Sequence, residues 1–212
     1  MNRRLPVYLL LDTSGSMRGE AIQAVNNGLE VLIQKLREDP FALETVWLSI
    51  ITFDRDVNVI FPLSELASVQ LPEIRTPDSG PTHMGKALMV LLDQVRSEVR
   101  ANSAETKGDW RPLLFLMTDG KPSDKALYDT AAVSIKELTW GAIIACSAGA
   151  SAVDADLKKL TDKVVHLETM DGSTMMSFFK WVSESIGTGN RSIGAQDQFM
   201  LPPPPSEVHV II

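Results

Sequence analysis

The sequence predicts an α/β fold, built on a doubly wound and mostly parallel sheet with helices on both faces. The first observation is that Leu5–Leu11 and Leu113–Met117 are continuously apolar, as strands covered on both faces are. The second is that Glu20–Glu38 and Met84–Asn102 repeat apolar residues at helical spacing. The third is that strand and helix patterns alternate along the chain, which predicts a ligand site at the carboxyl ends of the parallel strands.

The remaining elements complete this alternation. A strand is predicted at Thr45–Phe53, and so few residues separate it from the next apolar run that we expect a hairpin and therefore one antiparallel edge strand. A proline-rich loop follows at Pro62–Pro81. The other predicted strands are Val57–Phe61, Trp140–Ser147 and Lys163–Leu167, and the other predicted helices are Ser123–Leu138, Ala152–Thr161 and Ser173–Ile186.

Length, charge and cysteine content narrow the class of protein. The 212 residues suffice for one full core, and the net charge of −7, from 20 Lys and Arg against 27 Asp and Glu, argues against nucleic acid as a partner. No apolar run approaches the ~20 residues that span a bilayer. Cys146 is the only cysteine, so no intramolecular disulfide can form, and we expect it to be a buried core residue. These features favour a cytoplasmic protein.

The composition changes after Ile186, which divides the chain into a predicted domain at residues 1–187 and a C-terminal Pro-rich tail at residues 188–212. Pro202–Pro205 is a short polyproline stretch, and Val208–Ile212 is β-prone. Such a segment behind a stiff spacer is suited to adding a strand to a sheet edge, on its own domain or on a neighbour, so tail-mediated self-association is one expectation. A disordered tail is the alternative.

Asp12, Ser14 and Ser16 are the first candidate site residues. They follow the strand Leu5–Leu11, in a loop where Gly15 permits a tight turn and alternate side chains can face one point. One carboxylate and two hydroxyls are hard oxygen donors, which suit Mg2+, Mn2+ or Ca2+ better than zinc or copper. The alternative is that Asp12 or Ser14 only caps the following helix.

Two further candidates lie elsewhere in the chain. Thr82 stands at the entrance of a predicted helix, and Asp119 follows a buried strand. Together with the first loop, Asp12-Thr-Ser14-Gly-Ser16, the loop threonine and Thr118-Asp119-Gly120 resemble the metal-ion-dependent adhesion site of von Willebrand factor A (VWA) domains. The resemblance covers roughly Leu5–Ile186, and it implies the Rossmann-like fold of that family.

The resemblance also implies a role for each site residue. Ser14, Ser16 and Thr82 correspond to ligands whose hydroxyls reach the metal directly, whereas Asp12 and Asp119 correspond to carboxylates that hold it mainly through water. With neutral direct ligands, a bound Mg2+ remains a good electrophile with one exchangeable position. An Asp or Glu of a partner protein would fill that position, so the site is expected to bind an acidic side chain.

Within that family, the chain is similar to the tellurite-resistance TerY-type proteins of bacteria. The similarity rests on Ile51-Thr52-Phe53-Asp54 at the second strand and on Thr118-Asp119-Gly120-Lys121-Pro122-Ser123-Asp124 at the fourth. It implies an adaptor in a bacterial stress-response system, with a protein kinase or a protein phosphatase as a partner.

Other classes of protein fit the sequence less well. The paired Asp loops resemble those of aspartic proteases, but helical periodicity follows both of them here. A metal-dependent hydrolase or phosphoryl-transfer enzyme is the alternative reading, although no Gly-rich phosphate loop and no conspicuous nucleophile accompany the site. A structural protein that uses no metal is a third class. We therefore predict no enzyme activity and no catalytic residues.

Several polar residues near the predicted loops have less specific interpretations. Asp54 and Asp56 are expected to be solvated carboxylates at a hairpin tip, with a place near the site as the alternative. Lys121 and Asp124 either line the rim of the site or belong to an exposed loop, and His83 is interpreted as a helix-start residue.

Overall fold

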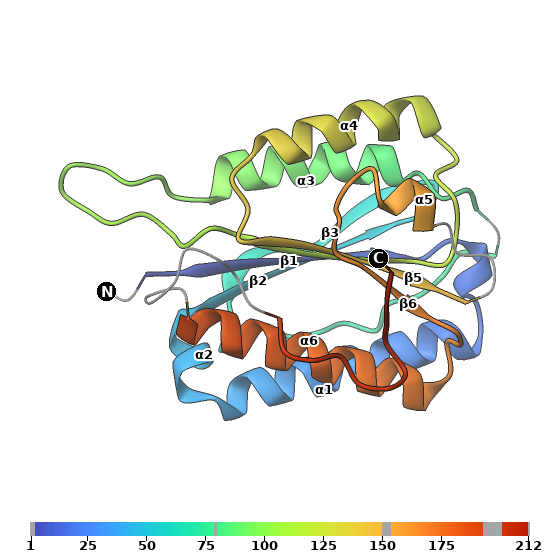
Figure 1. Ribbon diagram of the computed structural model, residues 1–212, viewed down its shortest axis with the longest axis horizontal. Coiled ribbons are helices and arrows are strands. Elements are labelled where there is room, and N and C mark those ends of the chain that lie inside the picture. The colour runs from blue at the N-terminus through green and yellow to red at the C-terminus, as the bar shows by residue number, and fades with distance from the viewer. Residues whose placement is uncertain (1–2, 79, 150–153, 193–200, 212) are drawn as a thin grey trace.

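A seven-stranded sheet forms the middle of the architecture in residues 3–78, 80–149, 154–192 and 201–211, the parts of the chain that the computed structural model describes (Figure 1). Its strands are β1 (Leu5–Asp12), β2 (Val46–Phe53), β3 (Val57–Glu65), β4 (Leu113–Thr118), β5 (Ala142–Ala148), β6 (Val164–Leu167) and β7 (His209–Ile211). The helices are α1 (Glu20–Glu38), α2 (Pro40–Thr45), α3 (Met84–Glu98), α4 (Lys125–Glu137), α5 (Asp154–Leu157) and α6 (Gly172–Ser192), and Gly15–Met17 form a short 3-10 turn, η1.

The order of strands across the sheet is β3-β2-β1-β4-β5-β6-β7. Neighbours from β2 to β6 pair in parallel, while β3 and β7 pair antiparallel with β2 and β6. The predicted doubly wound, mostly parallel sheet is confirmed, and β3 is the predicted antiparallel edge strand. The structure adds a second antiparallel edge strand, β7. Both edges are antiparallel, because the C-terminal tail returns to add β7 to its own sheet.

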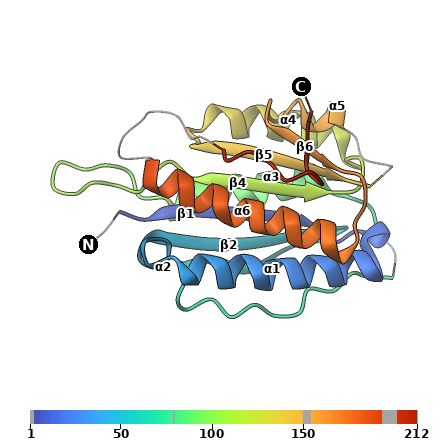
Figure 2. The same cartoon turned by 60° about the horizontal axis from the view of Figure 1, so that its bottom comes forward.

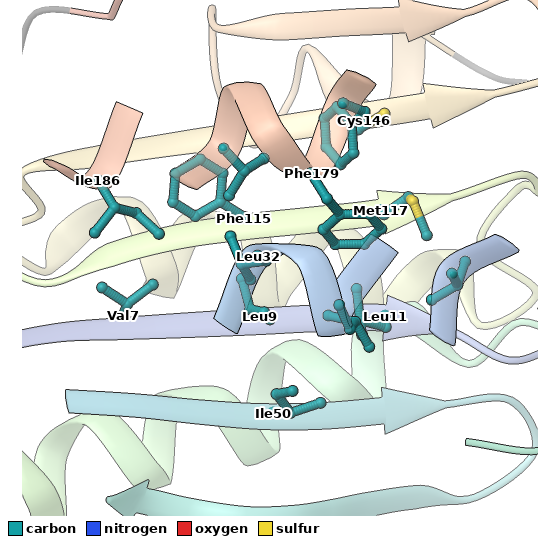
Figure 3. Close-up of a cluster of buried hydrophobic side chains, with 14 of the residues drawn as sticks. Val7, Leu9, Leu11, Leu32, Ile50, Phe115, Met117, Cys146, Phe179 and Ile186 are labelled. Atoms are coloured by element: carbon teal, nitrogen blue, oxygen red, sulfur yellow. The ribbon is translucent and has the colours of Figure 1, made fainter. Parts of the chain in front are cut away.

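Two hydrophobic cores lie on opposite faces of the sheet, as the uniformly apolar β1 predicts. Successive side chains of a strand alternate between faces, so Val7, Leu9 and Leu11 join the core under α1 and α6, whereas Tyr8 and Leu10 join the core under α3 and α4. Figure 3 shows part of the first core, and Figure 2 shows α1 and α6 side by side across that face. This double coverage holds β1 and β4 rigidly at the centre.

α1 packs closely on α6 at a point where a glycine faces an aromatic ring. Gly28 of α1 lies so close to the ring of Phe179 that a Cβ added there would overlap it. Cys146 is fully buried in the same core, as the sequence predicts, and burial raises the pKa of its thiol.

Several predicted boundaries differ from the structure. The helix expected to run to Asn102 ends at Glu98, and the proline-rich loop begins only after Glu65 because β3 is longer than predicted. The sequence analysis also missed α2. Pro40, two residues after the end of α1, begins α2, because the Asp39 carboxylate accepts hydrogen bonds from the amides of Phe41 and Ala42 (2.9 and 3.3 Å).

The last two predicted helices also differ from the helices of the structure. The last helix was expected to end at Ile186 but continues to Ser192, so its final turns lie beyond the predicted domain limit at residue 187. The first residues of the helix expected at Ala152–Thr161 lie outside the described residues, and only Asp154–Leu157 are α-helical there. Within the described part of the chain, no helix is both long enough and apolar enough to cross a bilayer.

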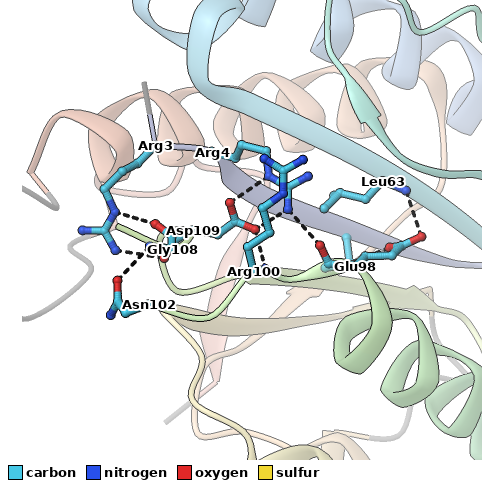
Figure 4. Close-up of polar contacts among 9 residues, drawn as sticks. Arg3, Arg4, Leu63, Glu98, Arg100, Asn102, Gly108 and Asp109 are labelled. Atoms are coloured by element: carbon cyan, nitrogen blue, oxygen red, sulfur yellow. Dashed lines mark hydrogen bonds and ion pairs between the residues drawn. The ribbon is translucent and has the colours of Figure 1, made fainter. Parts of the chain in front are cut away.

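The amino edge of the sheet carries a buried ion pair (Figure 4). Arg4 donates to both oxygens of the Asp109 carboxylate, and its guanidinium lies 4.5 Å from the centre of the Trp47 ring. Arg4 Nη2 also donates to the backbone carbonyl of Glu98 (2.8 Å), and the Asp109 carboxylate also accepts from the amide of Arg100 (2.8 Å). These contacts fasten the loop between α3 and β4 to the start of β1.

Candidate metal centre

Three loops meet at the carboxyl edge of the sheet. β1 and β4 are direct neighbours and pair in parallel, so the loops that follow them leave the sheet side by side. The first carries Asp12, Ser14 and Ser16, and the second carries Asp119. The third loop leads into α3 and carries Thr82. The strand order therefore brings all five predicted site residues to one edge of the molecule.

Asp12 is the most deeply buried of the five, with no exposed surface. Its Oδ2 accepts a hydrogen bond from the Thr118 hydroxyl (2.5 Å), and its Oδ1 accepts one from the Ser14 amide (2.7 Å). Burial nevertheless raises the pKa of Asp12 to about 6, because the desolvation of the charged form outweighs these two hydrogen bonds. Asp12 thus holds a proton far more readily than an exposed aspartate does.

Ser14, Ser16 and Asp119 form a continuous chain of oxygen atoms. The two serine hydroxyl oxygens are 3.2 Å apart, and Ser16 donates to Asp119 Oδ1 at 2.8 Å. Ser14 and Asp119 are buried, whereas Ser16 is exposed. Burial raises the pKa of Asp119, against the lowering effect of the hydrogen bond from Ser16. The chain of oxygens therefore begins inside the protein and ends at its surface.

Thr82 is held against the loop that contains Asp119. Its amide donates to Ser123 Oγ (3.0 Å), and its carbonyl accepts from the Ser123 amide (2.8 Å). A Cβ added to Gly120 would lie 3.2 Å from Thr82 Oγ1, so the threonine hydroxyl sits directly over the glycine. An added methyl group at this position would crowd the Thr82 hydroxyl, so Gly120 leaves it room next to the loop.

Helix capping does not explain the first loop. Ser14 occupies the N-cap position of η1 but makes no side-chain capping hydrogen bond, and α1 begins only at Glu20. Gly19 is the residue that precedes α1, and its φ of 82° places it in the left-handed region that favours glycine. The alternative in which Asp12 or Ser14 caps the following helix is therefore wrong.

Two supporting residues were missed or misread from the sequence. Thr118 bonds Asp12, and its place next to Asp12 follows from the pairing of β1 with β4. Asp54 was expected at a solvated hairpin tip, but it is half-buried and joins two of the loops: its carboxylate accepts from the Thr13 hydroxyl (2.9 Å), and its carbonyl accepts from the His83 amide (2.9 Å).

The other polar residues near the site have structural roles. Asp124 is not a free rim residue, because its carboxylate accepts from the amides of Gly85 and Lys86 (3.0 and 2.8 Å) and so caps α3. Lys121 is exposed, and the side chain of Asp56 is 74% exposed, as the hairpin interpretation predicts. Ring atom Nδ1 of His83, just before α3, lies 2.9 Å from the Arg55 carbonyl.

The geometry of these residues fits a divalent cation. Ligands about 2.1 Å from an octahedral Mg2+ stand about 3 Å apart, and Ser14 Oγ and Ser16 Oγ, two of the direct ligands that the resemblance implies, are 3.2 Å apart. Asp119 Oδ1 lies 2.8 Å from Ser16 Oγ, where it can accept from a ligand or from a metal-bound water. Two buried carboxylates lie here, and in the described part of the chain no ion pair joins either of them to a Lys, Arg or His. A cation would offset the cost of their burial.

The fold and the site define a class: a doubly wound α/β domain with an oxygen-lined site at the carboxyl edge of its central strands. Residues 7–178 match the family model described as von Willebrand factor type A domain. The chain belongs to the von Willebrand factor type A domain family. Domains of this family are typically metal-dependent protein-interaction modules rather than enzymes.

Solved structures share the fold at low sequence identity. A von Willebrand factor type A structure from Catenulispora acidiphila is 18% identical, with a TM-score of 0.67, and the match covers 86% of this chain and 42% of that one. Proximal thread matrix protein 1 from the mussel byssus, described with a zinc-occupied MIDAS motif, is 19% identical, with a TM-score of 0.61 and coverages of 88% and 48%.

A third similar structure is the ArnB paralog VWA2 from Sulfolobus acidocaldarius, at 19% identity, a TM-score of 0.60 and coverages of 87% and 45%. The chain therefore spans about half the length of these three proteins. No curated protein matches the chain. Because the identities are low, the structural matches support the fold of this chain and leave its partners to be proposed.

Proposed function

We propose that this chain is a metal-dependent protein-interaction module that binds an acidic side chain of a partner protein. The observation that carries the proposal is the pair of buried carboxylates, Asp12 and Asp119, which share one edge with three hydroxyl side chains. The proposed metal site consists of Asp12, Ser14, Ser16, Thr82 and Asp119. The proposed ion is Mg2+, with Mn2+ or Ca2+ as alternatives, because all five donors are hard oxygens.

The five residues have different proposed tasks. Ser14, Ser16 and Thr82 bind the ion through their hydroxyl oxygens, while Asp12 and Asp119 balance its charge mainly through water. When bound, the ion supplies an electrophilic position that a carboxylate of the partner can occupy. Thr118 orients Asp12, and Gly120 leaves the space that Thr82 needs. Asp54 holds the first loop next to the third.

The proposed partner and setting are more specific than the family. The similarity of the Ile51–Asp54 and Thr118–Asp124 segments to TerY-type proteins supports an adaptor role in a bacterial tellurite or stress response, in the cytoplasm. The partner is then a protein kinase, a protein phosphatase or a complex that contains one of them. Neither nucleic acid nor membrane insertion is part of the proposal, and the tail at residues 188–212 contributes self-association.

A serine-type hydrolase would need a reachable nucleophilic hydroxyl, and Ser147, the serine that lies beside Asp154 and His166, does not provide one. Ser147 has no exposed surface, and its hydroxyl donates to Asp154 (2.5 Å) while lying 2.9 Å from His166 Nδ1. A serine nucleophile must instead be reachable and must donate its proton to the histidine. The cluster thus serves to join β5, β6 and α5, and the interaction module remains the proposal.

Capture of partners from a bacterial lysate tests the function. The immobilised chain is compared with Asp12→Ala and Thr82→Ala, first in Mg2+ and then in excess chelator. We expect the wild type to retain a specific protein only in Mg2+ and both variants to lose it. Asp56→Ala is the matched control, because Asp56 is an exposed aspartate on a neighbouring loop. Capture of the same protein by all four chains in Mg2+, undiminished in excess chelator, would contradict the proposal.

A further inference from the structure

β7 is a short strand that closes one edge of the sheet with the last residues of the chain. It pairs antiparallel with β6 through three residue pairs: Val164 with Ile211, Val165 with Val210 and His166 with His209. In Figure 1 the dark red tail passes α6 and ends beside β6. The edge of β6 is therefore a site that accepts an extended segment, and the structure identifies one segment that fits it.

In residues 201–211, contacts with α6, with β6 and with both hydrophobic cores attach the tail. Val208 is 3% exposed and joins the core under α1 and α6, and the carbonyl of Pro202 accepts a hydrogen bond from Trp181 Nε1 of α6 (3.0 Å). By contrast, Val210 is 53% exposed and the side chain of His209 is 50% exposed. Ile211, the third residue of β7, is partly buried against the core under α3 and α4. A three-residue strand with two half-exposed side chains gives up only a modest buried surface when it leaves.

β6, in contrast, is an apolar strand that is stabilised by a paired strand on each side. Val164, Val165 and Leu167 are all at most 2% exposed, so β6 has the composition of a central strand. Without β7, an apolar strand with a row of unpaired backbone groups would form the edge of the sheet, and such edges pair readily with other chains. The chain thus combines a loosely attached strand with an edge that requires one.

We propose that this edge of β6 also accepts residues 208–211 of a second copy of the chain, which produces dimers by exchange of the tail strand. A second copy is the occupant that fits best because its tail makes the same contacts as the chain's own. The 16 residues 193–208 between α6 and β7 can extend about 50 Å, enough to reach a neighbouring molecule. The inference specifies the self-association in the proposed function and does not depend on the metal site.

Single cysteine variants provide a direct test. Val165 and Val210 are opposite each other, and cross-strand Cα distances of about 4.5–5.5 Å suit a disulfide. Full-length Val165→Cys and Val210→Cys proteins, carrying tags of different size, are mixed over a range of concentrations and oxidised in excess chelator. A yield of this disulfide above that of random collisions indicates that the tail of one copy lies on β6 of the other. Cys146 is buried and does not react.

We expect a covalent heterodimer whose yield rises at least fivefold over that of a collision control, and rises further with concentration. The collision control replaces Val165→Cys by Val133→Cys, a 55% exposed position on α4. Val208→Asp, added to the Val210→Cys chain, is expected to lower the yield because it removes the buried anchor of the tail.

The double variant Val165→Cys/Val210→Cys is expected to form the disulfide within one chain at low concentration. Absence of that internal disulfide would contradict the docked tail itself. An internal disulfide together with a heterodimer yield no higher than that of the collision control would contradict exchange. Because every arm contains chelator, failure of the metal-dependent function leaves these outcomes unchanged.

Discussion

The two edges of the central strands handle buried charge in opposite ways. At the amino edge, the buried carboxylate of Asp109 meets Arg4 in a two-point contact, and backbone groups satisfy the remaining donors. At the carboxyl edge, Asp12 and Asp119 are equally buried, but hydroxyls and amides are their partners, and burial raises the pKa of both carboxylates. At the amino edge a cationic side chain balances the buried carboxylate. At the carboxyl edge no ion pair with a Lys, Arg or His balances either carboxylate in the part of the chain that the structure describes.

This difference indicates what each edge is for. Paired and hydrogen-bonded charges at the amino edge hold the long loop after α3 against β1, which is a structural task (Figure 4). Unpaired carboxylates at the carboxyl edge destabilise the metal-free chain, which is acceptable where a ligand supplies the missing charge. Four predictions test this contrast.

The largest loss of unfolding free energy is expected when the ion pair at the amino edge is broken. Asp109→Ala leaves Arg4 buried without a counter-charge, and removing one partner of a buried pair costs about 3–5 kcal/mol of unfolding free energy. Urea unfolding measures it. The matched control is Asp129→Ala, which breaks an exposed pair with Lys159 and should leave the unfolding free energy nearly unchanged, because solvent screens exposed pairs. Equal losses in the two variants would remove the distinction between a buried and an exposed pair.

Replacing the carboxylate of Asp12 is expected to stabilise the metal-free chain, whereas replacing that of Asp109 destabilises it. The pKa of Asp12 is about 6 in the folded chain, against an ordinary value of 3.8, so the folded chain binds more protons between these pH values and its stability falls as the pH rises through this range. Asp12→Asn abolishes that loss and should stabilise the chain by up to about 3 kcal/mol at pH 7, with little difference at pH 4.

Chemical unfolding at the two pH values, in chelator, measures this stabilisation. Asp56→Asn is the control, since the Asp56 side chain is mostly exposed and its replacement should leave stability nearly unchanged at both pH values. A destabilised Asp12→Asn at pH 7 would mean that the hydrogen bonds from Thr118 and Ser14 outweigh the burial of the charge.

Mg2+ should stabilise the wild type, since an ion that binds only the folded chain adds about 2.7 kcal/mol at a hundred times its Kd. Ser16→Ala should reduce this gain, whereas Ser103→Ala, an exposed serine at the opposite edge, should not. The gain should also shrink below about pH 6, where Asp12 takes up a proton. Thermal unfolding with and without Mg2+ gives the result, and equal gains in both serine variants would count against the site.

The smallest effect is expected at Gly120. A methyl group there would meet Thr82 Oγ1 at 3.2 Å and push the threonine outward, so Gly120→Ala should weaken Mg2+ binding by about tenfold, or 1.4 kcal/mol. Gly172→Ala is the control, because nothing lies near its added Cβ. Titration calorimetry compares the two, and unchanged affinity in Gly120→Ala would exclude Thr82 from the site.

Periodicity predicted most of the fold. α1 runs from Glu20 to Glu38 in the structure as in the sequence, because a strong apolar stripe and a proline after it mark the helix clearly. α2 was missed, since its six residues are too few for periodicity and its start depends on the Asp39 cap. The sequence did not decide where the second antiparallel edge strand, β7, would pair. It allowed the strand to join the sheet of its own domain, as the structure has it, or the sheet of a neighbouring molecule.

The site was predictable to the extent that its residues follow strands. Asp12 and Asp119 were found because each ends a buried strand, and the strand order then makes them neighbours. The contacts of Thr118 and Asp54 were not found, because they depend on which loop lies beside which. The domain limit at residue 187 stays a prediction. So does the role in metal binding of the five site residues, Asp12, Ser14, Ser16, Thr82 and Asp119.

Calorimetric titration of Mg2+ into chelator-treated protein at about pH 7 tests the central claim most directly. Wild type, Asp12→Asn, Asp119→Asn and Asp56→Asn are compared, so that two buried carboxylates of the site are matched with an exposed one nearby. We predict one saturable site in the wild type and in Asp56→Asn, and its loss in the other two variants. Binding that is absent from the wild type, or that survives in Asp12→Asn and Asp119→Asn, would contradict the assignment of this edge as a metal centre.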